Sequence, residues 1–93
     1  MIVGILEVRI RLFASDSLKD KRRVVKSLFA RLRSNFNISV SELGDYPLWQ
    51  MVHFGIVHLS PDSVYSNHVL DTIVEFLDRQ RDFFVVDLHK ELL

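Results

Sequence analysis

Hydrophobic residues repeat along this 93-residue chain with two different periods, and the order of those periods constrains the fold. A period of two, typical of a strand with one buried face, runs over residues 1–13, 38–43, 48–59 and 83–92. A helical period of about 3.6 runs over residues 18–36 and 64–80. The predicted order is therefore strand, helix, strand, strand, helix, strand.

This order predicts one ferredoxin-like α+β domain over residues 1–93. Two right-handed crossovers give a four-stranded antiparallel sheet, strand order 4-1-3-2, with both helices on one face. Ser17, with Asp20 three residues later, is the predicted N-cap of the first helix, and Ser60, followed by Pro61, that of the second. Residues 44–47 (Gly-Asp-Tyr-Pro) predict a turn.

The strands carry two apolar faces. The even-numbered residues are the larger apolar set and are expected to meet the helices: Leu6, Val8, Ile10, Val52, Phe54, Ile56, Phe84, Val86 and Leu88. The odd-numbered set is then expected on the open face of the sheet, with Glu7, Arg9, Arg11, His53 and Asp87 among its apolar members: Val3, Ile5, Trp49, Met51, Val57, Phe83 and Val85. These apolar members are the candidate self-association residues.

Such an open face is too apolar to meet only water, so we expect it to bind something. The favoured interpretation is a homodimer formed sheet on sheet. The other interpretation is a platform for nucleic acid, as in RNA-recognition domains, which stack bases on strand aromatics. Residues 50–57 lack the basic-glycine-aromatic run of those domains, and the first strand has no central aromatic residue.

Charge is divided unevenly along a chain whose net charge is zero. Residues 1–36 carry nine Lys/Arg and three Asp/Glu, whereas residues 37–93 carry three and nine. The first helix holds the candidate RNA-binding residues Lys19, Lys21, Arg22, Arg23, Lys26 and Arg33. Lys21 projects into the apolar arc, which is the part of the helix surface that carries the hydrophobic residues. The other five form one stripe that could follow a phosphate backbone. The alternative is a solvated stripe, or one paired with Asp71, Glu75 and Asp78 of the second helix.

No sequence motif indicates an active site. The chain has no P-loop, nucleophile elbow or dinucleotide fingerprint, and no cysteine. Residues 13–17 lack the glycines of the acylphosphatase phosphate cradle, which leaves an acylphosphatase-like hydrolase as a remote alternative. His53 and His58 are five residues apart on one strand and point to opposite faces, so we expect no metal site and no cofactor.

Without a signal peptide or an apolar span, we expect a soluble cytoplasmic protein with no membrane partner and no evident small-molecule substrate.

Three segments carry a family resemblance: residues 1–4 (Met-Ile-Val-Gly), residues 17–23 (Ser-Leu-Lys-Asp-Lys-Arg-Arg) and residues 48–50 (Leu-Trp-Gln). With them the chain resembles, over nearly its whole length, the YlxP-like family of small bacterial proteins, a domain family of unknown function. The resemblance implies a ferredoxin-like fold and a gene setting among translation initiation and ribosome-maturation factors. It supplies no catalytic residues. His53 and the terminal Lys90-Glu91 depart from the usual family pattern.

Two functions are therefore expected. The first is a non-enzymatic accessory factor that binds ribosomal RNA or a ribosomal particle through the first helix. The alternative is a homodimeric protein-interaction module that uses the open face of its sheet.

Overall fold

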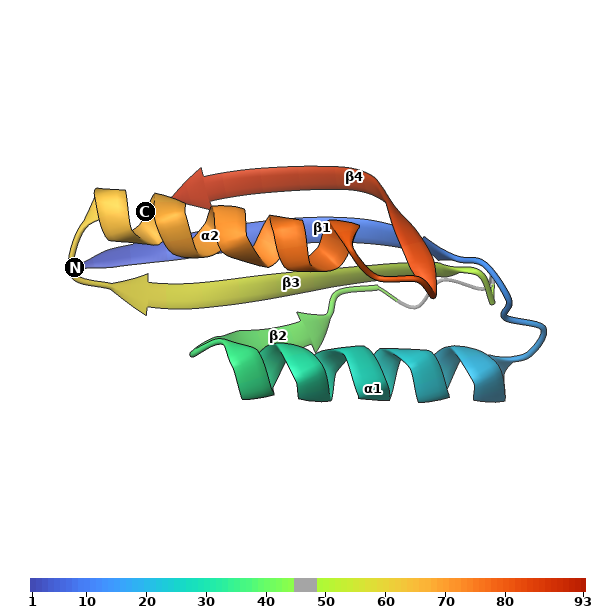
Figure 1. The fold of residues 1–93 in the computed structure, drawn as a ribbon. Helices are drawn as coiled ribbons and strands as arrows, with labels where there is room; N and C mark the ends of the chain where they lie inside the picture. Colours follow the sequence, from blue (N-terminus) through green and yellow to red (C-terminus); the bar gives the residue numbers. More distant parts are fainter. Residues whose placement is uncertain (45–48) are drawn as a thin grey trace.

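A computed structural model describes residues 1–44 and 49–93. Its elements follow the predicted order (Figure 1): β1 (Ile2–Leu12), α1 (Leu18–Asn35), β2 (Ser39–Glu42), β3 (Met51–Ser60), α2 (Ser63–Asp78) and β4 (Phe83–Leu92). Residues 45–47 of the predicted turn and Leu48, the predicted start of the third strand, lie outside the described residues. Trp49 and Gln50 form a turn, so β3 begins later than predicted, at Met51.

β1 lies at the centre of the sheet, between β3 and β4, and β2 extends the sheet beyond β3. The strand order is β2-β3-β1-β4, and every pairing is antiparallel. This confirms the ferredoxin-like α+β fold and the predicted strand order, read from the other edge. Val3 and Leu93 exchange two backbone hydrogen bonds of 2.9 Å, so the first and last strands meet beside the two chain ends (Figure 1).

The hydrophobic core lies between the sheet and the two helices. The even-numbered side chains of β1 and β3 are buried, as predicted: Leu6, Val8, Ile10, Val52, Phe54 and Ile56. Leu28 and Leu32 of α1 and Leu70, Ile73 and Leu77 of α2 join the same buried cluster. Both helices therefore cover one face of the sheet, and the odd-numbered side chains of β1 and β3 are left on the other.

The N-cap of α1 lies where the sequence predicted it, whereas the N-cap of α2 lies two residues later than predicted. Ser17 Oγ accepts a hydrogen bond from the Asp20 amide at 3.1 Å, which confirms the predicted N-cap of α1. The predicted N-cap of α2 was wrong: Asp62 takes this position, and its Oδ1 accepts from the Tyr65 amide at 2.8 Å. Ser60 cannot serve because it still belongs to β3, where it pairs with Ile2.

A β-bulge in β4 overturns the predicted faces of four residues. The register shifts between Arg9, whose partner is Asp87, and Ile10, whose partner is Val85, so Val86 is the extra residue. As a result Phe83 and Val85 face the helices, and Phe83 is only 2% exposed. The side chains of Phe84 and Val86 are exposed instead. Phe83 and Val85 therefore do not belong to the open face, contrary to the prediction.

Candidate nucleic-acid interface

The helix α1 presents five of its basic side chains to solvent. Lys19, Arg22, Arg23, Lys26 and Arg33, here called the α1 stripe, are all exposed, as the helical period predicts. Lys19, Arg22 and Lys26 follow each other at spacings of three and four residues, so they lie on one side of the helix over about 10 Å of its axis. Within residues 1–44 and 49–93, no side-chain hydrogen bond or ion pair engages these three cations.

The other two members of the α1 stripe have partners inside the chain. Arg23 Nη2 donates to Asp20 Oδ1 at 2.8 Å, which neutralises part of the charge in the first turn. Arg33 Nη2 lies 3.3 Å from the carbonyl oxygen of Val40, and its guanidinium carbon lies 5.9 Å from the centre of the Phe29 ring. The charge that is free to meet a ligand is therefore concentrated in the first half of α1.

Lys21 lies apart from the α1 stripe. It is only 4% exposed, in the first turn of α1, on the side that packs on the sheet. The sequence placed Lys21 in the apolar arc, and the structure agrees. Among the candidate RNA-binding residues, Lys21 is therefore the one that does not lie on the exposed surface of α1.

The acidic residues of α2 do not neutralise the α1 stripe in the part of the chain that the structure describes. Asp71 Oδ1 lies 3.5 Å from Lys90 Nζ of β4. Arg31, outside the stripe, spans the gap between the helices: it donates to Gln80 Oε1 and lies 3.9 Å from Asp82 Oδ2. Pairing of the α1 stripe with Asp71, Glu75 and Asp78 within one chain is thus not seen.

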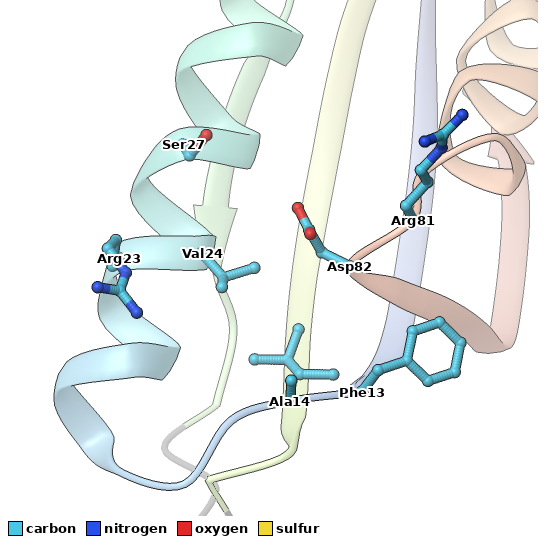
Figure 2. Close-up of a pocket in the computed structure, with 8 residues that line it drawn as sticks. Phe13, Ala14, Arg23, Val24, Ser27, Arg81 and Asp82 are labelled. Carbon is cyan, nitrogen blue, oxygen red and sulfur yellow. The ribbon is translucent and has the colours of Figure 1, made fainter.

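A cleft of about 400 Å³ opens beside the first half of α1 (Figure 2). Arg23, Val24 and Ser27 line it from α1, and Arg81 and Asp82 line it from the connection between α2 and β4. The end of β1 and the residues after it close the cleft below with Leu12, Phe13 and Ala14. The lining thus combines apolar residues with Arg23, Ser27, Arg81 and Asp82, and Figure 2 shows the Arg81 side chain pointing away from α1.

The open face of the sheet is apolar toward the end that holds the chain termini. Ile5 pairs with Val57 and Val3 with Leu59 across β1 and β3. Val57 is 42% and Leu59 56% exposed, while Val3 and Ile5 are half-buried. Met51 lies half-buried on β3 toward the opposite end, and Trp49 is exposed in the turn before that strand.

Charged side chains at the centre of the open face are paired with each other. His53 Nε2 lies 2.7 Å from Glu7 Oε2. Arg9 Nη1 donates to Asp87 Oδ2 at 3.0 Å, and Arg9 Nη2 lies 3.7 Å from Glu7 Oε2. The register explains this grouping, because Arg9 stands opposite His53 on one side and Asp87 on the other. The centre of the face is therefore a cross-strand network rather than a free charge.

Sequence reasoning missed the cleft. Phe13 and Ala14 follow β1, while Arg81 and Asp82 precede β4, and of these four only Phe13 lies in a predicted periodic segment, as its last residue. Only the three-dimensional packing of two connections against α1 brings them together. The one available signal was Phe13, a large apolar residue in an otherwise polar connection.

Comparison with known proteins assigns the chain to a family. Residues 3–90 match the family described as "Protein of unknown function (DUF503)". The chain belongs to this family. The DUF503 chain is also 34% identical over 77 residues to the uncharacterized protein YlxP of Bacillus subtilis (strain 168), a match that covers 83% of this chain and 84% of that protein. Both findings confirm the YlxP-like resemblance of the sequence.

Neither α1 nor α2 is long and apolar enough to cross a bilayer. Across the described ranges, no three His, Asp or Glu side chains gather in a way that could hold a metal ion.

Proposed function

We propose that this DUF503 chain is a cytoplasmic, non-enzymatic accessory factor that binds RNA, with ribosomal RNA or a ribosomal particle as its target, through the first half of α1. The observation that carries the proposal is the set of three exposed cations, Lys19, Arg22 and Lys26, on one side of α1. They have no partner among the described side chains, so a polyanion would not have to displace an existing ion pair to reach them.

Phosphate binding by such a surface needs no further chemistry. Each phosphate that a cation neutralises releases condensed counterions, which supplies affinity that falls as salt rises. Arg23 extends the surface toward the cleft, although Asp20 shares its charge. The family setting among translation initiation and ribosome-maturation factors, implied by the resemblance, favours ribosomal RNA over other polyanions.

The proposal is tested by fluorescence anisotropy with a labelled fragment of ribosomal RNA, titrated at several salt concentrations. With three phosphate contacts, log affinity is expected to fall against log salt with a slope between about −2 and −3. The double variant Arg22→Glu/Lys26→Glu is expected to abolish binding while its circular dichroism spectrum stays unchanged.

A matched control separates local charge from net charge. Arg11→Glu/Arg79→Glu makes the same change in net charge at two exposed positions outside α1, and we expect it to retain most of the affinity. Absence of binding at low salt, or equal losses in the two double variants, would contradict the proposal.

A second candidate function, a homodimer formed through the open face, is favoured by a specific observation. Arg9 at the centre of that face already pairs with Asp87 and Glu7 within the chain, so covering these ions costs less free energy than covering free charges. An isologous contact brings one patch onto its own copy, and the apolar strip of Val3, Ile5, Val57 and Leu59 would then meet itself. The occupant proposed for this face is a second copy of the chain, which would carry two α1 stripes.

A further inference from the structure

We infer that α1 binds duplex RNA through its phosphate backbone and does not read the base sequence. This inference rests on the proposed function and adds to it the form of RNA that is bound. The observation behind it is the composition of the exposed side of α1 over residues 18–27, which holds four cations and no aromatic or amide side chain.

This side of α1 offers charge without a surface for stacking bases. Proteins that bind single strands stack successive bases on aromatic rings. The exposed ring that lies nearest in the sequence, Phe13, packs on Phe84 with 5.4 Å between ring centres, and Figure 2 shows it turned away from α1. A single strand on this side of α1 would therefore gain phosphate contacts and no stacking. The exposed side chains of residues 18–27 are Leu18, Lys19, Arg22, Arg23, Lys26 and Ser27.

The three cations without partners stand at a fixed, close spacing. Lys19, Arg22 and Lys26 lie within about 10 Å of helix axis. The helix that carries them is capped by Ser17 and packs on the sheet, so their backbone positions are set before any ligand binds. A duplex likewise holds its phosphates in place before binding, whereas a single strand loses conformational entropy when three of its phosphates are brought to these positions.

A duplex also has the denser charge, so each phosphate contact releases more counterions. Log affinity falls with log salt by about 0.9 per contact for a B-form DNA duplex and by about 0.7 for a single strand. If an RNA duplex behaves like the B-form duplex, three contacts favour it over a single strand by about fourfold at about 0.1 M salt.

None of the contacts that this side can make depends on the identity of a base. The major groove of an RNA duplex is deep and narrow, so side chains do not reach the base edges there. Arg22 and Arg23 would then meet phosphates, and Asp20 already holds Arg23 at 2.8 Å. The Ser27 hydroxyl can bond a 2′-hydroxyl in the shallow minor groove, and every nucleotide of RNA carries that group. We therefore expect equal affinity for stems of different sequence.

The test measures fluorescence anisotropy with three RNAs of equal phosphate number: a hairpin, the same hairpin with its stem base pairs shuffled, and an unstructured single strand. The two hairpins are expected to bind within about twofold of each other and, at about 0.1 M salt, about fourfold more tightly than the single strand. The expected salt slopes are about −2.7 for both hairpins and about −2.1 for the single strand.

Two variants at one position separate charge from base recognition. Arg22→Lys keeps the charge and removes the planar set of donors, so it should keep the affinity for both hairpins within about twofold. Arg22→Gln removes the charge and should make the salt slope shallower by about 0.9, equally for both hairpins. Trp49→Ala removes an exposed ring in the turn before β3; it is the control and should change none of these affinities.

The outcomes separate this inference from the proposed function. Equal or tighter binding of the single strand, or a difference of more than about tenfold between the two hairpins, overturns the duplex inference alone. A single-strand preference that Trp49→Ala removes would assign base stacking to the turn before β3 and would also overturn it. Absence of binding to all three RNAs overturns both the inference and the proposed function.

Discussion

His58 has one ring nitrogen hydrogen-bonded and the other buried without a partner. Its Nδ1 lies 2.9 Å from the carbonyl oxygen of Asn37, which can only accept, so Nδ1 carries the proton. Its Nε2 is then an acceptor, and it is buried with no hydrogen-bond partner in the described part of the chain. The side chain joins β3 to Asn37, two residues after the end of α1, at the cost of one unsatisfied group.

We expect His58→Phe to change the free energy of unfolding by less than about 1 kcal/mol, because one lost hydrogen bond is offset by removal of the unsatisfied nitrogen. His58→Ala, which leaves a cavity as well, should destabilise the fold by about 2–4 kcal/mol. Urea denaturation of the two variants checks both values. A loss of several kcal/mol in His58→Phe would instead show that Nε2 is engaged, for instance by a buried water molecule.

The bulge in β4 adds one residue to that strand without changing which side chains enter the core. Phe83 and Val85 precede the extra residue Val86, and Leu88 follows it, yet all three pack toward the helices. Without Val86 the strand would be regular, and the same three side chains would still share one face, since they would then be two residues apart. The bulge therefore changes the local twist of β4 and leaves the same three side chains packed toward the helices.

Deletion of Val86 is accordingly expected to leave the fold intact, with a change in unfolding free energy below about 2 kcal/mol. The matched control is deletion of His53 from β3, where the ladder is regular. That deletion turns every following side chain of β3 to the wrong face and should prevent folding. Circular dichroism and urea denaturation distinguish the two. Collapse of the Val86 variant would mean that the bulge itself is required.

Charge and apolar surface lie on different sides of the molecule. The α1 stripe faces away from the sheet, while the apolar strip and the paired ions occupy the opposite, open face. The proposed RNA binding and the proposed self-association would therefore use different surfaces, and a dimer through the open face would leave both α1 helices exposed.

Sedimentation equilibrium at micromolar concentration is expected to give twice the chain mass of 10.9 kDa. Val57→Glu, in the apolar strip of the open face, should return the monomer mass, because a buried unpaired carboxylate would face its own copy. Val64→Glu, at an exposed position on α2, is the control and should remain dimeric. A wild-type monomer in the same range would rule out the dimer.

Periodicity predicted the element order, the sheet order and the core of β1 and β3, because apolar and other residues alternate over residues 6–12 and 52–56. It failed in β4, where residues 83–86 are all apolar and no alternation shows which side chains face inward. It failed at the start of α2, because Ser60 and Asp62 are both good N-caps and only strand pairing decides between them. It placed the α1 stripe correctly, but the cleft and the ion network depend on contacts between distant segments, which no local pattern encodes.

The pairing of Val3 with Leu93 makes the backbone nearly a closed ring. A few added residues would join the two ends, and the ring could then be reopened in the exposed connection between β1 and α1, giving a circular permutant with the same strand neighbours in a new chain order. The same adjacency means that the domain could sit inside a loop of a larger host protein, entering and leaving at one point, with α1 and its cleft still turned outward.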